Sequence, residues 1–71
     1  MKPDISVVIP VYNEADNLTE LFSRLMSTMD KLGRPYEVIF TNDGSKDDSG
    51  KILRDFFKQR PDEVRVIDFN G

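Results

Sequence analysis

Two stretches of the chain place polar side chains directly after an apolar run, and their residue types could do chemistry. The first, IPVYNEADNL, supplies Pro10, Tyr12 and Glu14, and the second, IFTNDGSKDDS, supplies Asp43. The sequence contains no histidine and no cysteine. Acid, base or metal chemistry therefore depends on carboxylates, with lysine and tyrosine as distant alternatives, and thiol nucleophiles and zinc thiolate sites are excluded.

The hydrophobic pattern along the chain alternates between two periods. Short runs rich in β-branched and aromatic residues predict three strands, and apolar residues three and four apart predict two amphipathic helices. The predicted order is a strand at residues 5–9, a helix at about 14–32, a strand at 36–41, a helix at about 49–59 and a strand at 64–69. Strands that alternate with helices over such short connections indicate an α/β fold. The expected architecture is a βαβαβ parallel sheet with right-handed crossovers.

The first strand and the start of the second helix have patterns of their own. The run ISVVI is polar only at Ser6, which predicts a strand covered on both faces. The residues Asp47, Asp48 and Ser49 precede or open the second helix. For these three we prefer a role as helix caps to a role in ligand binding.

In an open parallel sheet, the loops that leave the carboxyl ends of the strands converge at one edge, and ligands bind there. Tyr12, Glu14 and Asp43 lie in or beside such loops. The loop after the first strand has no glycine and the chain has no Gly-Lys-Ser/Thr sequence, so a dinucleotide fingerprint and a P-loop are excluded. A receiver-like domain is not favoured, because its paired acids would stand where this chain has Pro10 and Val11.

The remaining hypothesis is a pocket that reads a base and a ribose through side chains. A carboxylate only accepts hydrogen bonds, and uracil has a ring N–H where cytosine has an acceptor, so Asp43 would favour uracil or thymine. Tyr12 could stack on the base or use its hydroxyl, and Glu14 could bind a ribose hydroxyl or hold the loop. Structural alternatives stay open: a turn residue at Asp43, a helix-dipole contact at Glu14 and a packing role for Tyr12.

The composition limits the partners. There are 13 acidic and 10 basic residues, a net charge of −3, and no basic cluster that could neutralise several phosphates, which argues against nucleic acid and anionic membranes. No apolar run approaches the ~20 residues that span a bilayer, and no signal-like segment is expected at the N-terminus. The lack of cysteine suits a cytoplasmic protein. With 71 residues the chain is at most one small, marginally stable domain.

The two motifs together resemble the opening of the family 2 glycosyltransferases. SVVIPVYNE is followed further along by YEVIFTNDGSKDDS, and the resemblance covers essentially the whole chain. It implies an inverting enzyme of the GT-A fold with a nucleotide-sugar donor, for which UDP is expected, and it implies that residues 10–14 and Asp43 form the nucleotide pocket. VYNEADNL and LGRPYEVIFTNDGS are most similar to the branch that loads sugars onto polyprenyl phosphates. One departure is Asn42, where many members have a first aspartate.

The resemblance also implies that residues 1–71 are a single partial domain, the Rossmann-like half of a GT-A catalytic domain. In that family the metal-binding Asp-x-Asp motif and the general base come later, so we expect no catalytic residues and no metal ligands here, and no transfer by this chain alone. A divalent metal, Mg²⁺ or Mn²⁺, is expected for the full-length enzyme. Its acceptor would be lipid-linked, such as a polyprenyl phosphate, and the parent protein would be membrane-associated.

Two other classes of function stay open. One is a stand-alone nucleotide-binding or regulatory module that binds uridine diphosphate without transfer. The other is a protein-interaction unit. In the resembled fold the first strand is central, so a chain of this length would leave one edge of that strand bare, and bare edges invite pairing into a homo-oligomer.

Overall fold

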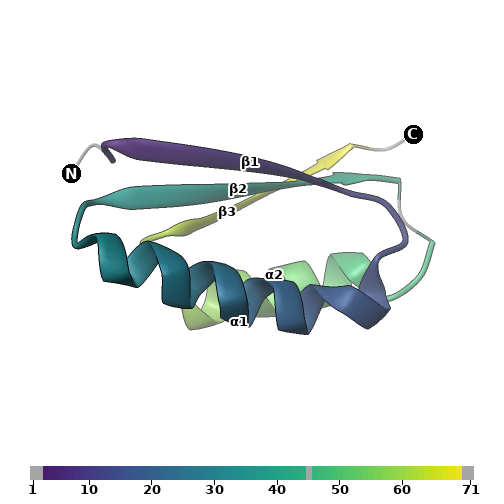
Figure 1. Cartoon of the computed structure of the whole chain (residues 1–71). Helices are drawn as coiled ribbons and strands as arrows, with labels where there is room; N and C mark the ends of the chain where they lie inside the picture. Colours follow the sequence, from purple (N-terminus) through teal and green to yellow (C-terminus); the bar gives the residue numbers. More distant parts are fainter. Residues whose placement is uncertain (1–2, 45, 70–71) are drawn as a thin grey trace.

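The computed structural model describes residues 3–44 and 46–69 (Figure 1). The three strands form one parallel sheet in the order β1-β2-β3. The elements are β1 (Ile5–Val11), α1 (Ala15–Leu32), β2 (Tyr36–Asp43), α2 (Ser49–Gln59) and β3 (Val64–Phe69). The predicted α/β fold with βαβαβ topology is therefore confirmed. Neither helix of this described part is both long enough and apolar enough to cross a membrane.

Strands β1 and β2 each run two residues further than predicted, to Val11 and Asp43. Pro10 does not end β1, although it lacks an amide donor, and it pairs with Thr41 of β2. Within the described residues β1 has a ladder partner on one side only, and proline is tolerated in such an edge strand. The extension brings the last residues of both strands into one ladder.

Both helices lie against the same face of the sheet, and the described part of the chain leaves the other face uncovered (Figure 1). The strand order explains this arrangement, because each crossover moves one strand further in the same direction and right-handed crossovers then pass over the same face. On the uncovered face, Val8 and Ile67 are 60% and 45% exposed. The prediction that the first strand is covered on both faces is wrong for this part of the chain.

The core between sheet and helices is centred on Phe22 of α1, Phe40 of β2 and Phe56 of α2. Phe22 and Phe56 stack with their ring centroids 3.9 Å apart. Phe40 is fully buried and tilts against both rings, at 6.5 Å from Phe22 and 5.8 Å from Phe56. Burial of one such side chain contributes about 2 to 3 kcal/mol. The three rings fix both helices to β2 and so determine where the loops at the carboxyl edge of the sheet begin.

Candidate functional site

The ends of β1 and β2 lie side by side at the carboxyl edge of the sheet. Val11 pairs with Asn42 in the parallel ladder, so Tyr12 follows β1 at the level where Asp43 completes β2. Pro10 lies one step earlier in the same ladder. The predicted arrangement of the two segments as neighbouring parallel strands is confirmed, and it brings the residues predicted to contact a ligand to one edge.

The four predicted site residues Pro10, Tyr12, Glu14 and Asp43 are all exposed. Because Tyr12 is 56% exposed, a packing role for its ring is not supported within this chain. Asp43 alternates with the buried Asn42, so it belongs to the sheet face away from the helices. The surface hollows described are lined by other residues, and a pocket shared by Tyr12 and Asp43 stays a prediction.

Glu14 stands immediately before α1 and begins that helix through its backbone. Its carbonyl accepts hydrogen bonds from the amides of Asn17 and Leu18, at 2.9 and 3.1 Å. Its side chain makes no cap hydrogen bond, and its Oε2 accepts only a long one of 3.4 Å from Asn17 Nδ2. An exposed carboxylate held this weakly can turn to a ligand such as a ribose hydroxyl.

Side chains join the loop after β1 to the loop after β2. Oδ1 of Asn13 accepts a hydrogen bond from the amide of Lys46 at 2.7 Å. Oγ of Ser49 accepts one from the amide of Glu14 at 3.0 Å. Asn13 has a φ of 50°, in the left-handed region that asparagine adopts more readily than most residues. The two loops therefore form one polar unit at the carboxyl edge.

Asp47 bridges the starts of the two helices. Its Oδ1 accepts from the amide of Ser49 at 2.9 Å, and its Oδ2 accepts from the amide of Ala15 at 3.2 Å. Hydrogen bonds from the Ser49 hydroxyl and amide, and from the Ala15 amide, lower the pKa of Asp47 below its ordinary value. The Asp-x-Ser spacing predicts the local contact, whereas the bridge to α1 has no signal in the sequence. Asp48, at the N-cap position itself, makes no side-chain cap hydrogen bond.

Asn42, the departure from the resembled motif, is a link between β2, β3 and α2. It is 8% exposed, and its Nδ2 donates to Oδ1 of Asp68 at 3.0 Å. A Cβ at position 50 would stand 2.9 Å from the same nitrogen, so a side chain there would displace the Asn42 amide. Asn42 thus faces the helices while Asp43 faces away from them.

We expect Asn42→Asp to destabilise the fold by about 1 to 2 kcal/mol at pH 7, because it replaces a donor with a second carboxylate facing Asp68. In the folded variant the two facing carboxylates repel each other, which raises one pKa of the pair above its value in the unfolded chain. The loss of stability is therefore complete above this raised pKa. It fades as the pH falls towards about 4, the value of an aspartate in the unfolded chain. Urea unfolding at pH 7 and at pH 4 measures both effects. The double variant Asn42→Asp/Asp68→Asn restores a donor opposite an acceptor and should recover most of the stability; an unrecovered loss would contradict this explanation.

The described residues form no protein-only cage for a divalent metal. Within residues 3–44 and 46–69, no group of three or more acidic side chains lies close enough to hold an ion. Mg²⁺ at nucleotide sites is usually held by one or two carboxylates together with water and substrate phosphates. The expectation that the metal ligands of the full-length enzyme lie outside this chain therefore stays a prediction.

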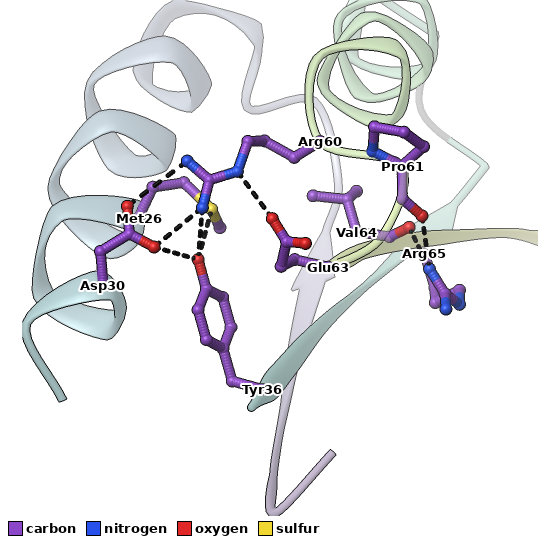
Figure 2. Close-up of polar contacts among 8 residues, drawn as sticks. All are labelled: Met26, Asp30, Tyr36, Arg60, Pro61, Glu63, Val64 and Arg65. Carbon is purple, nitrogen blue, oxygen red and sulfur yellow. Dashed lines mark hydrogen bonds and ion pairs between the residues drawn. The ribbon is translucent and has the colours of Figure 1, made fainter. Parts of the chain in front are cut away.

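A cluster of charged side chains at the opposite, amino-terminal edge of the sheet was not predicted (Figure 2). The Arg60 guanidinium donates to Asp30 Oδ1, Glu63 Oε1 and the Tyr36 hydroxyl at 2.8, 2.9 and 2.8 Å, and that hydroxyl donates to Asp30 at 2.8 Å. Asp30 and Glu63 raise the pKa of Arg60, and Arg60 lowers that of Asp30. Because these groups satisfy one another, the cluster fastens the ends of α1 and α2 to the start of β2.

The phenol of Tyr36 gives this cluster a pH dependence. Burial raises the pKa of Tyr36 to about 12, from an ordinary value of 10. The folded chain thus holds the Tyr36 proton more tightly than the unfolded chain. The resulting contribution of Tyr36 to the free energy of unfolding is complete below pH 10 and is lost as the pH rises towards 12. The loss is on the order of 2 kcal/mol. In Tyr36→Phe this alkaline loss should disappear, although the variant is about 1 kcal/mol less stable at pH 7. Urea unfolding of both chains from pH 8 to 11.5 measures the slopes, and parallel slopes would contradict the assignment.

Comparison with known proteins places these observations in a family. A family model described as Glycosyl transferase family 2 matches residues 6–71. The undecaprenyl-phosphate 4-deoxy-4-formamido-L-arabinose transferase of Edwardsiella ictaluri is 51% identical over 57 residues, which are 80% of this chain and 17% of that protein. The transferase of the same name from Klebsiella pneumoniae is 51% identical over 66 residues, 93% of this chain and 20% of that protein.

A further relative is an uncharacterized glycosyltransferase of Synechocystis sp., 41% identical over 70 residues, which are 99% of this chain and 22% of that protein. The chain therefore spans between 17% and 22% of the length of these three relatives. The family model, which matches residues 6–71, covers both loops at the carboxyl edge.

Proposed function

The chain belongs to glycosyl transferase family 2, and from this membership we propose that residues 1–71 are the nucleotide-binding part of a glycosyltransferase catalytic domain. The ligand is the nucleotide of a nucleotide-sugar donor, and the nucleotide is UDP. The observation that carries the proposal is the parallel pairing of β1 with β2, which leaves Tyr12 and Asp43 at the same edge of two adjacent strands.

Each predicted site residue has a role in this proposal. Asp43 accepts a hydrogen bond from the ring N–H of uracil. It disfavours cytosine, because the carboxylate would then face a ring nitrogen that is also an acceptor. The exposed ring of Tyr12 stacks on the base. Glu14 accepts a hydrogen bond from a ribose hydroxyl, and Pro10 shapes the wall of the pocket at the end of β1.

The chemistry of transfer requires more than these residues. Inverting transfer needs a base to deprotonate the acceptor and positive charge to stabilise the leaving diphosphate. We assign neither role to the described residues, whose part is to bind and orient the donor. The chain alone is therefore expected to bind a nucleotide without turning over a sugar donor.

The acceptor and the location are proposed from the relatives. Two of them are named undecaprenyl-phosphate sugar transferases, and we propose a polyprenyl phosphate as the acceptor of the whole protein. Such an acceptor lies in a membrane, so the whole protein would work at a membrane surface with its nucleotide site in the cytoplasm. A divalent metal would be held by residues other than those described here.

Calorimetric titration of the 71-residue chain tests the proposed function. UDP, CDP, GDP and ADP are titrated separately, without added metal. We expect weak binding of UDP, with a Kd on the order of 1 mM or tighter, about −4 kcal/mol, and weaker binding of CDP. Equal binding of all four nucleotides, or no binding of any, would refute the assignment of a uracil-reading pocket.

One observation favours a second candidate function, a unit that pairs with another copy of itself. Within the described residues β1 has a free edge, and Val8 on its uncovered face is 60% exposed. Free strand edges promote pairing between chains. Sedimentation analysis over a wide range of concentrations would reveal dimerisation, and dimerisation without UDP binding would favour this function over the first.

A further inference from the structure

We propose that Asp47 is a positioning residue, whose carboxylate holds the loop carrying Tyr12 and Glu14 in a fixed relation to the loop carrying Asp43. This inference rests on the proposed function, because it concerns the shape of the same site. Asp47 is not assigned a contact with the nucleotide. It acts through the backbone of both loops, and it therefore fixes the geometry on which recognition depends.

The Asp47 carboxylate lies between the first residues of the two helices. Its Oδ1 accepts from the amide of Ser49, the first residue of α2, and its Oδ2 from the amide of Ala15, the first residue of α1, at 2.9 and 3.2 Å. First-turn amides lack partners inside their own helix and form the positive end of its dipole. One carboxylate therefore satisfies amides of both helices, and both helix dipoles stabilise its charge.

Ser49 adds a second link between the two loops. We call Asp47 and Ser49, with the amides of Glu14 and Ala15 that they accept from, the brace. Ser49 is fully buried, its Oγ accepts from the amide of Glu14 at 3.0 Å, and its own amide donates to Asp47 Oδ1 at 2.9 Å. Ser49 thus contacts the loop after β1 through its side chain and Asp47 through its backbone. Removal of the carboxylate leaves the amides of Ala15 and Ser49 without their acceptor, which loosens both links.

Hydrogen exchange on the 71-residue chain tests the brace without any ligand. In Asp47→Ala the amides of Glu14 and Ala15 should exchange about tenfold faster or more, while the amide of Val38, in the core of β2, changes by less than about twofold. The matched control is Asp48→Ala, the adjacent exposed acid with no side-chain cap hydrogen bond, which should leave all these rates unchanged. Unchanged exchange at Glu14 and Ala15 in folded Asp47→Ala would overturn the proposal.

If Asp47→Ala does not fold, Asp47→Asn takes its place. The amide keeps the size of the side chain and one acceptor oxygen, so one of the two helix starts retains its bond. We expect faster exchange at Ala15 or at Ser49 but not at both. Exchange as slow as in the unsubstituted chain at both amides would overturn the role of the carboxylate.

Nucleotide binding provides the readout that a merely structural role would not change. In folded Asp47→Ala the Kd for UDP should rise by about three- to tenfold, the cost of ordering the loops on binding, and Asp47→Asn should restore part of the loss. The preference for UDP over CDP should persist, because Asp43 is intact. A lower urea midpoint with unchanged UDP affinity would overturn the positioning role. Failure of the unsubstituted chain to bind UDP would overturn the proposed function instead, and the exchange rates would still decide whether the brace exists.

Discussion

Replacement of Asp43 by alanine should weaken UDP binding by about ten- to a hundredfold, because it removes the acceptor that we assign to the ring N–H of uracil. Hydrogen bonds to a charged group contribute about 1.5 to 3 kcal/mol, and 1.4 kcal/mol corresponds to a factor of ten. Asp43 is exposed and completes β2, so its removal should leave the fold intact. Calorimetric titration with UDP and CDP measures both affinities.

The variant Asp43→Asn keeps the size of the side chain but changes its hydrogen-bonding groups, so it tests whether base preference depends on the carboxylate as an acceptor. An amide carries a donor and an acceptor and can turn either to the base, so the preference for UDP over CDP should shrink to within about twofold. Asp48→Ala removes a nearby exposed carboxylate with no side-chain cap hydrogen bond and should leave both affinities unchanged. A UDP preference that survives in Asp43→Asn would show that another group reads the base.

Phe40→Ala should remove a large share of the free energy of unfolding at 25 °C. Truncation of a buried phenylalanine costs about 3 to 5 kcal/mol, whereas a chain of 71 residues has a total free energy of unfolding of about 4 to 11 kcal/mol. Phe40 is fully buried and contacts the rings of Phe22 and Phe56, one from each helix. Its loss therefore loosens both helices from the sheet at once. Urea unfolding followed by circular dichroism measures the change.

Phe69→Ala is the matched control for this substitution. Phe69 is 51% exposed at the end of β3, so the same truncation should cost about 1 kcal/mol or less. Both variants replace a phenylalanine with alanine, and they differ in how deeply the removed ring is buried. Similar urea midpoints for both would mean that the three-ring cluster does not hold the layers together.

The elements of this fold could be predicted because local pattern determines them. The second helix and the third strand have the predicted bounds, and β1 and β2 differ only at their ends. The first strand is predicted to end at Ile9, whereas Pro10 still pairs within this edge strand, where a missing donor is tolerated. The uncovered face of β1 could not be read from ISVVI, because an apolar run does not reveal which neighbours cover it.

The site was predictable only in part. Tyr12 and Asp43 could be brought to one edge from sequence, since the carboxyl ends of parallel strands meet there. The contact of Asp47 with Ala15 spans 32 residues and depends on the register of two strands, so no local sequence pattern predicts it. The contact of Arg60 with Asp30 spans 30 residues and has no local signal either.

The most direct test of the central claim, that the ends of β1 and β2 make one nucleotide site, is an amide chemical-shift titration of the 71-residue chain with UDP. We predict that the amides of Tyr12, Glu14, Asp43 and Asp47 shift together and saturate with a single Kd. The amides of Asp30 and Arg60, at the opposite edge, should not move. Shifts confined to one of the two loops, or centred on the opposite edge, would contradict the claim.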